Sequence, residues 1–371
     1  MTTILVSGAV ANKHRHGGSV WVRMSWAEGL RALGFDVVFV EELAAPDAAA
    51  AGAFDAVMSE FGFTGSAALV HPETGTVRGM ERAELLARAS DAALLVNLTG
   101  HLRWAPLRER VRRAAYVDLD PGYTQVWASQ GHDLGLASHD LHFTVGLNVG
   151  SPRCALPDAS VAWRPIRQPV VLDRWPVATQ GFTGFSTVAS WRGAYGPLDW
   201  GGRTLGTKAH EFRRVAGVPR ASGLPFSVAL DIHPADAADR ALLSTGGWEI
   251  LAPACVGTPE AFARFVRASG AEFSPAQGVY VHARTGWFSD RTVRYLASGR
   301  PALVQDTGFG DALPVGEGLL AYSTPAQAAA RARELAADHV RHAVAARDIA
   351  ERHFAHDVAL APLLEAAGVA P

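Results

Sequence analysis

The chain contains only two lysines, Lys13 and Lys208, among its 34 lysine and arginine residues. Because arginine carries the positive charge everywhere else, we expect a lysine to be kept for its compact ammonium group, which a guanidinium does not reproduce. Lys208 follows the glycine-containing loop 202–207 and begins a predicted helix over 208–215. A loop, a lysine and a helix start can together cradle a phosphate. The alternative is a surface lysine at a helix start, since the GxxxxGK[ST] spacing is missing.

A polar loop over residues 9–18 follows the first predicted strand, 4–7, and ends in Gly17 and Gly18. These glycines would let a ligand approach the free N–H groups at the start of the next helix. His14 and His16 precede them, and either imidazole could act as a general base near neutral pH. The alternative is that both are exposed loop histidines.

Two aspartates, Asp118 and Asp120, follow a predicted strand over 115–118. Such a pair can hold a divalent metal against phosphates, although two residues do not make a metal site alone. In the plainer alternative, Asp120 begins a turn before Pro121 and Gly122. We expect Asp120 to be a carboxylate of the cleft and expect no metal.

The most informative string runs from Gly286 to Thr292 and precedes a predicted helix over 291–297. Ser289 suits the N-cap, so the helix would direct its N–H groups, Arg291 and the Thr292 hydroxyl toward a diphosphate. Gln305 and Asp306 lie at the carboxyl end of the predicted strand 302–305, where they could bind sugar hydroxyls. The alternative is that the neighbouring aromatic residues are core and that Asp290 only serves the helix dipole.

These residues can form one site only if the fold brings the ends of several strands together. The sequence pattern predicts such a fold. Apolar strands alternate with helices in both halves, which indicates doubly wound parallel sheets whose ligands lie beyond the carboxyl ends of the strands. Elements expected on this basis include a helix over about 105–114 and a strand over 278–282. The proline-rich stretch 150–181 places the domain boundary near 174–181. We therefore expect domains over 1–175 and 176–345, followed by C-terminal helices over 346–371.

Composition narrows the class of protein. Hydrophobic residues make up 49% of the 371 residues and charged residues 19%, which excludes an intrinsically disordered chain. A net charge of −2 argues against nucleic-acid binding. The sequence has neither an apolar run of about 18 residues nor the basic start of a signal peptide. The isolated Cys154 and Cys255 favour a reducing compartment, so we expect a cytoplasmic protein.

A dinucleotide-binding domain is the first alternative for the N-terminal half. Glu41 and Glu42, at the end of the second predicted strand, imitate the acid that binds a ribose in such domains. The GxGxxG fingerprint, however, is absent after the first strand, where Gly8 stands alone.

With these motifs in order, the chain resembles the GT-B glycosyltransferases. Gly17-Gly18 is similar to the family's glycine loop, and Leu33-Gly34 with the strand after it to the family's second strand. Lys208 looks like the donor-phosphate lysine. Gly299-Arg300-Pro301, followed by Asp306, Thr307 and Gly308, resembles the donor-binding core, and the strand after Gly316 resembles the next family strand. The resemblance implies two Rossmann-like domains that face a cleft, with the acceptor on the N-terminal domain and a nucleotide sugar on the C-terminal domain.

Several positions depart from the family pattern. The two glutamates that retaining members often carry before the glycine-proline turn are replaced by Gly286 and Arg294. The sequence signature of inverting members is matched only in part. Neither stereochemical class is supported, and Glu272 and Asp290 are the candidates for the ribose-binding acid.

The leading hypothesis is glycosyl transfer from a nucleotide-diphosphate sugar to a soluble small-molecule or glycan acceptor, without a further cofactor. His16 and Asp120 are the catalytic candidates. The donor-binding candidates are Gly17, Gly18, Lys208, Glu272, Ser289, Asp290, Arg291, Thr292, Asp306, Thr307 and Gly308. The alternatives are a nucleotide-sugar epimerase or phosphorylase of similar architecture and a catalytically silent homologue that binds a nucleotide sugar.

Overall fold

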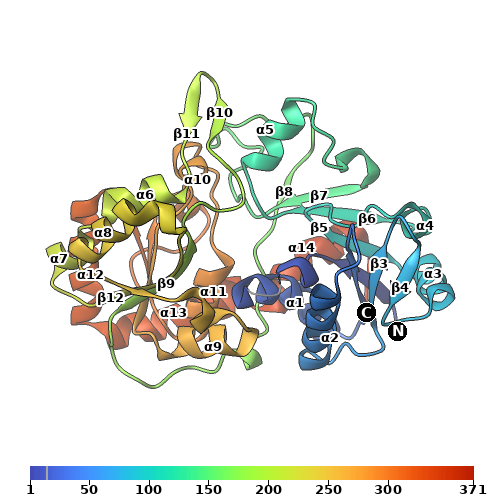
Figure 1. Cartoon of the computed structure of the whole chain (residues 1–371), viewed down its shortest axis with the longest axis horizontal. Helices are drawn as coiled ribbons and strands as arrows, with labels where there is room; N and C mark the ends of the chain where they lie inside the picture. Colours follow the sequence, from blue (N-terminus) through green and yellow to red (C-terminus); the bar gives the residue numbers. More distant parts are fainter. Residues whose placement is uncertain (14–15) are drawn as a thin grey trace.

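The computed structural model describes residues 1–13 and 16–371. The chain forms two α/β halves that lie side by side, each built on a mainly parallel sheet (Figure 1). Both faces of the first sheet are buried, because alternate residues of its central strand belong to different cores: Ile4 and Val6 to one, Leu5 to the other. The prediction of two doubly wound parallel-sheet domains is confirmed.

The first sheet has the strand order β4-β3-β2-β1-β5-β6-β7-β8, with only β4 antiparallel to its neighbour. Its strands are β1 (Thr3–Ser7), β2 (Asp36–Glu42), β3 (Ala67–His71), β4 (Thr76–Arg78), β5 (Leu94–Leu98), β6 (Ala114–Asp118), β7 (Leu141–Thr144) and β8 (Arg164–Pro165). The helices of this half are η1 (Ala11–Lys13), α1 (Gly17–Ala32), α2 (Ala48–Glu60), α3 (Arg82–Asp91), α4 (Ala105–Arg108), α5 (Tyr123–Ser129), η2 (Leu136–Ser138) and η3 (Leu172–Arg174).

The second sheet is wholly parallel, in the order β13-β12-β9-β14-β15-β16. Its strands are β9 (Phe185–Ser190), β12 (Phe226–Asp231), β13 (Trp248–Leu251), β14 (Ala271–Ser274), β15 (Ala302–Gln305) and β16 (Leu319–Tyr322). A separate hairpin joins β10 (Leu198–Trp200) to β11 (Arg203–Leu205). The helices are α6 (Lys208–Val215), α7 (Val218–Ser222), η4 (Pro234–Asp236), α8 (Ala237–Gly246), η5 (Pro253–Val256), α9 (Pro259–Ala268), α10 (Gly278–His282), α11 (Asp290–Ala297), η6 (Phe309–Asp311), α12 (Pro325–Ala337), α13 (His339–His353) and α14 (His356–Ala367).

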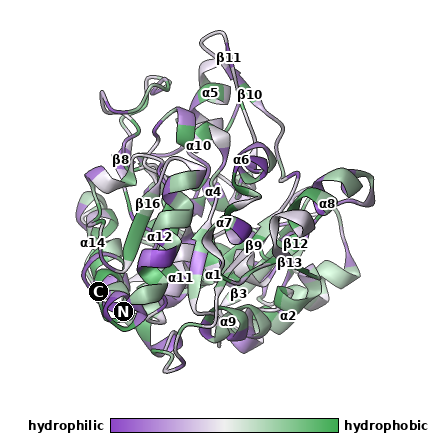
Figure 2. Ribbon diagram, turned by 90° about the vertical axis from the view of Figure 1, so that its left-hand side faces the viewer, coloured by the Kyte–Doolittle hydropathy of each residue, from purple (hydrophilic) through white to green (hydrophobic). Residues whose placement is uncertain are grey.

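Each sheet has a switch point, where neighbouring strands continue into loops that run in opposite directions. In the first sheet it lies between β1 and β5, and in the second between β9 and β14. Ligands of open α/β sheets bind at such points, beyond the carboxyl ends of the strands. The strands of the sheets are mainly hydrophobic, as Figure 2 shows for β16 at the edge of the second sheet.

The two halves meet along α1, which packs against α9 and α11 of the second half. The indole of Trp21 donates to the carbonyl of Pro259 at 2.9 Å. Arg294, which is 1% exposed, donates to the Ser25 hydroxyl at 2.9 Å. Of the C-terminal helices, α13 packs mainly on α11, whereas α14 crosses back to α1 and β7.

Two local predictions are wrong. Residues 278–282 form the helix α10 and no strand. The alternation Val-Tyr-Val imitates a strand, but Gly278 packs so closely on the backbone of Gly206 that a Cβ atom would lie 2.6 Å from its carbonyl oxygen. The helix expected over 105–114 ends at Arg108, and the following turn leads directly into β6.

The contact between the halves predicts that Gly17→Ala destabilises the protein. A Cβ atom on Gly17 would lie 2.1 Å from the carbonyl oxygen of Thr258, so α1 and α9 must separate. We expect a loss of about 1–3 kcal/mol in the free energy of unfolding, measured by urea denaturation. Gly52→Ala is the matched control, because nothing lies within 4 Å of that position in α2 and alanine should stabilise the helix by about 0.5–1 kcal/mol. Equal stability of the Gly17 variant and the wild type would contradict the close contact.

Candidate functional site

Two adjoining cavities lie between the halves, where the carboxyl ends of β9 and β12 face the loop after β1. The larger has a volume of about 620 Å³ and the smaller about 250 Å³. The residues that line both are His16, Ser19, Ser190, Gly193 and Asp231. The predicted catalytic residue His16 is exposed at the junction of the two cavities. His14 lies outside the described residues.

The two lysines lie on opposite sides of this cleft. Lys13 ends η1 of the first half and lines the larger cavity, whereas Lys208 begins α6 of the second half and lines the smaller one. Burial lowers the pKa of Lys13, and the charge of Arg23 lowers it further. Burial also lowers the pKa of Lys208, to about 7, with the charge of Arg291 adding to the effect. Such enclosed ammonium groups favour an anionic ligand.

Arg291 lies within electrostatic reach of Lys208, and each of its three guanidinium nitrogens donates to the protein. It donates to Glu272 at 2.6 Å, to the carbonyl of Val188 at 2.9 Å and to the Ser274 hydroxyl at 2.7 Å. The partners lie on both strands of the switch point, β9 and β14. Glu272 is 0% exposed, so it cannot reach a ribose in this structure and serves as the counter-ion of Arg291.

The start of α11 lines neither cavity, but it lies within electrostatic reach of Lys208, whose pKa the charges of Arg291 and Asp290 affect. The Ser289 hydroxyl accepts the N–H of Arg291 at 3.2 Å and caps the helix. Asp290 is half-buried, and its charge affects the pKa of Arg23 and Asp120 on the other domain. Thr292 is fully buried, so its hydroxyl is not available to a diphosphate in this structure.

Residues 306–308 lie at a joint between the halves and line neither cavity. The Asp306 carboxylate accepts the N–H of Gly308 at 2.8 Å, and Thr307 donates to the carbonyl of Trp287 at 2.6 Å. Asn148, from the first half, donates to the carbonyl of Gly308 at 3.0 Å. The side chain of Gln305 is likewise used internally, since it donates to the buried Glu211 at 2.6 Å.

Gly17 and Gly18 line the smaller cavity, but their lack of a side chain is needed for packing. A Cβ atom on Gly17 would collide with Thr258, and one on Gly18 would lie 3.0 Å from the ring of Phe262. The glycine pair therefore lets α1 approach the other half closely while its first turn stays beside the cavity.

In the N-terminal half, Asp120 interacts electrostatically with Lys13 and Arg23. Of these three residues, only Arg23 was not singled out from the sequence. The Asp120 carboxylate accepts from the Tyr280 hydroxyl of the other half at 3.2 Å. Burial raises the pKa of Asp120, while the charges of Lys13 and Arg23 oppose that rise. Asp118 is no metal ligand in this arrangement, because it is fully buried and accepts from three side chains: Thr124, Gln125 and Thr144.

Sequence reasoning missed Arg23, whose guanidinium interacts electrostatically with Asp120 and Asp290. Among the described residues, its side chain makes a single hydrogen bond, to the carbonyl of Ser19 at 3.2 Å, and its Nε atom is buried without a partner. Gly8 makes room for it, because a Cβ atom there would lie 2.7 Å from Arg23 Cγ. The i, i+4 spacing from Ser19 to Arg23 was the available signal, because it places both residues on one face of α1.

A strap formed by residues 191–197 connects the halves across the top of the cleft. On its own half, Arg192 forms a bidentate ion pair with Asp236. On the other half, the ring of Tyr195 packs against Tyr123 and Trp127 of α5, with centroid distances of 5.0 and 4.9 Å. Figure 1 shows β10 and β11, which follow the strap, rising beside α5.

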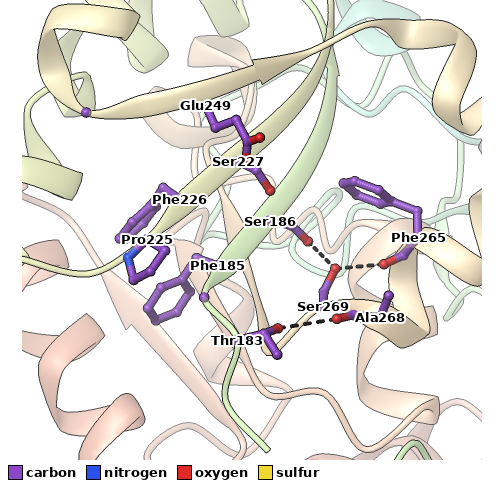
Figure 3. Close-up of a pocket in the computed structure, with 12 residues that line it drawn as sticks. Thr183, Phe185, Ser186, Pro225, Phe226, Ser227, Glu249, Phe265, Ala268 and Ser269 are labelled. Atoms are coloured by element: carbon purple, nitrogen blue, oxygen red, sulfur yellow. Dashed lines mark hydrogen bonds between the residues drawn. The ribbon is translucent and has the colours of Figure 1, made fainter. Parts of the chain in front are cut away.

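A further pocket, shown in Figure 3, lies at the opposite end of the second sheet. It is lined by the first residues of β9 and β12 and by the end of α9, with Ser186, Ser269 and Glu249 among them. Ser186 and Ser269 are hydrogen-bonded to one another. Because this pocket lies at the amino ends of the strands, away from the switch point, we place the candidate site in the cleft.

Among the described residues, no group of three or more His, Cys, Asp and Glu is arranged to hold a metal ion. Within the same residues, no helix has the length and apolar character needed to cross a bilayer.

Comparison with known proteins finds similarity in structure. No family model and no curated protein sequence matches the chain. An alpha-glucosyltransferase in complex with UDP superposes with a TM-score of 0.60 at 12% identity, covering 99% of this chain and 100% of that one. HepE from Anabaena, in complex with UDP and glucose, gives 0.60 at 11% identity, with 99% and 100% covered. Sucrose-phosphate synthase from Thermosynechococcus elongatus gives 0.55 at 11% identity, with 99% and 98% covered. The chain therefore has the GT-B fold that its motifs resemble.

The strap yields a prediction that needs no knowledge of the ligand. Tyr195→Ala removes two aromatic contacts worth roughly 1–3 kcal/mol together, so trypsin should cleave after Arg192 about tenfold faster. Mass spectrometry would identify the fragment. Tyr195→Phe keeps the ring and should be cleaved at the wild-type rate. Equal cleavage of the alanine variant and the wild type would show that the ring does not hold the strap.

Proposed function

We propose that the protein transfers a glycosyl group from a nucleotide-diphosphate sugar to a hydroxyl of a small-molecule or glycan acceptor. The observation that carries the proposal is the placement of the chain's two lysines on opposite sides of one cleft, beside the carboxyl ends of the sheets. The GT-B fold supports it, since similar structures contain UDP. For that reason a uridine-diphosphate sugar is the first donor to test.

The diphosphate is the group that gains negative charge as the glycosidic bond to the donor breaks. Lys208 and the N-terminal end of α11 would stabilise this charge, with no reorganisation needed at the moment of reaction. Arg291 acts through Lys208: it holds the floor of the site, and its own charge makes an anion more favourable there. We propose that a metal ion is not required, because these groups supply the positive charge.

The acceptor would bind against the N-terminal wall, near Asp120. If the reaction inverts the configuration, Asp120 or His16 is the general base that takes the proton of the attacking hydroxyl. If it retains the configuration, no base is needed at that position. The strap and the close contact of the halves would exclude water and so limit hydrolysis of the donor. We further propose a soluble cytoplasmic enzyme whose acceptor is not a nucleic acid.

A catalytically silent homologue is the second candidate. The positions at which retaining family members often carry glutamates hold Gly286, which packs on the backbone of Asn148, and Arg294, which is buried between the halves. Such a protein would bind the nucleotide sugar without releasing the nucleoside diphosphate.

The test is release of nucleoside diphosphate from UDP-, GDP-, ADP- and dTDP-sugars. We expect release from one nucleotide class and a loss of about 10²-fold or more in Lys208→Ala, since a preorganised charge that stabilises the leaving group is removed. Lys208→Arg should fail similarly, because the enclosed site fits an ammonium group. Arg240→Ala, which removes an exposed cation of the same half, is the control. Donor binding without release would favour the silent homologue, and no binding across the panel would overturn the proposal.

The pKa of Lys208 gives a pH prediction. With a pKa of about 7 in the free protein, the ammonium form is lost as the pH rises above 7. A bound diphosphate favours the charged form, so donor binding at pH 8 should take up a proton, and KM should rise by up to about tenfold per pH unit above 7. Titration calorimetry in two buffers of different ionisation enthalpy measures the uptake. A pH-independent KM in the wild type would exclude this role for Lys208.

A further inference from the structure

A buried carboxylate, Glu41, fills the loop that follows β1. Glu41 lies at the carboxyl end of β2 and is 0% exposed. Its Oε2 atom accepts the N–H groups of Val10 at 2.8 Å and Ala11 at 2.7 Å. Its Oε1 atom accepts the N–H of Asn12 at 3.4 Å. Three consecutive N–H groups thus converge on one side chain.

This arrangement explains why the first half does not present the dinucleotide site that its strand pattern imitates. In dinucleotide-binding domains, the loop after β1 directs its N–H groups at a pyrophosphate. Here the protein's own carboxylate occupies that nest of N–H groups. The acid at the end of β2, which imitates a ribose-binding acid in the sequence, turns back into the loop.

The same turn delivers Lys13 to the cleft. Residues 11–13 form η1, and the N–H of Lys13 donates to the carbonyl of Val10 at 3.1 Å. The backbone held by Glu41 therefore leads directly into the lysine that lines the larger cavity. Among the described residues, the Lys13 ammonium group makes no hydrogen bond or ion pair, so the backbone of η1 determines which part of the cleft the side chain can reach.

Holding an ionised carboxylate here costs stability. Burial raises the pKa of Glu41 to about 7, despite the three N–H groups and the charge of Arg23 from α1. His101, after β5, has its Nε2 atom 4.0 Å from Oε1. Its pKa is lowered to about 4 by burial, so it is neutral at pH 7 and offers no counter-charge. Because the folded pKa of Glu41 lies above the unfolded one, its contribution to stability is present below the unfolded value and is lost as the pH rises through about 7.

We propose that Glu41 is a positioning residue that holds the backbone of residues 10–12 and thereby directs the Lys13 side chain into the cleft. The inference rests on the proposed function, in which Lys13 acts on the ligand bound there. Proteins commonly keep a destabilising group at a position where activity depends on it. The buried carboxylate of Glu41 is such a group near pH 7.

The test compares Glu41→Gln with Glu42→Gln. Glutamine has nearly the same shape but presents an N–H₂ group to a nest of donors. The control residue, Glu42, holds a different backbone segment, since it accepts the N–H groups of Arg103 and Trp104, both at 2.7 Å. At pH 8, Glu41→Gln should lower kcat/KM by about tenfold to hundredfold through misplacement of Lys13. Its melting temperature should equal or exceed that of the wild type, and Glu42→Gln should keep wild-type kcat/KM.

Two further readouts separate positioning from a general structural role. Amide hydrogen exchange at residues 10–12 should be faster in Glu41→Gln than in the wild type and unchanged in Glu42→Gln. In a double-mutant cycle, Glu41→Gln should cost little once Lys13→Ala is present, because the two residues act as one unit. Additive losses, or wild-type kcat/KM in Glu41→Gln, would overturn the proposal.

The hydrogen-exchange measurement also separates a failure of this inference from a failure of the proposed function. If the wild type turns over no donor, the function fails, while faster exchange in Glu41→Gln still supports the hold on residues 10–12. Unchanged exchange overturns the inference whatever the activity. Should Glu41→Gln not fold, the wild type itself provides the measurement: exchange at residues 10–12, corrected for intrinsic base catalysis, should become faster as the pH rises through about 7, because ionised Glu41 favours the opened, solvated loop. Corrected exchange that does not change with pH would then overturn the inference.

Discussion

The ion pair between Arg291 and Glu272 is the interaction on which the site depends. It joins the start of α11 to both strands of the switch point, because Arg291 also reaches the carbonyl of Val188 on β9. A buried ion pair of this kind adds little to stability by itself, but removal of one partner typically costs about 3–5 kcal/mol. Its effect here is to hold the Arg291 guanidinium across β9 and β14, near enough for its charge to lower the pKa of Lys208.

The close approach of the halves follows from small residues at a few points. Gly17 and Gly18 bring α1 against α9, and Gly286 lies against the backbone of Asn148. The charged residues at the strand ends consequently face one another across a narrow cleft. Arg23 and Asp120 from one half then lie within the electrostatic reach of Asp290 from the other. Burial of these charges lowers stability and is offset by the apolar cores behind them.

The sequence was sufficient for the architecture and only partly for the site. The length of the apolar run identified the strand β15 with its observed bounds, because a buried strand between turn residues has a clear signature. Helix α10 was misread because three alternating residues carry too little information. Lys208 and the Ser289 cap were found from local spacing. Arg291 was expected at the site and lies within electrostatic reach of Lys208, but only the structure shows that its polar atoms, like those of Gln305 and Thr307, are already used. Arg23 and the role of Glu41 depend on contacts between distant segments, which no local pattern reveals.

The most direct test of the account is a crystal structure of the protein with UDP bound. The account predicts that the diphosphate lies in the smaller cavity, within hydrogen-bonding distance of the Lys208 ammonium group and beside the start of α11, with Arg291 still paired to Glu272. Binding in the pocket at the amino ends of β9 and β12, or a diphosphate that does not contact Lys208, would contradict it.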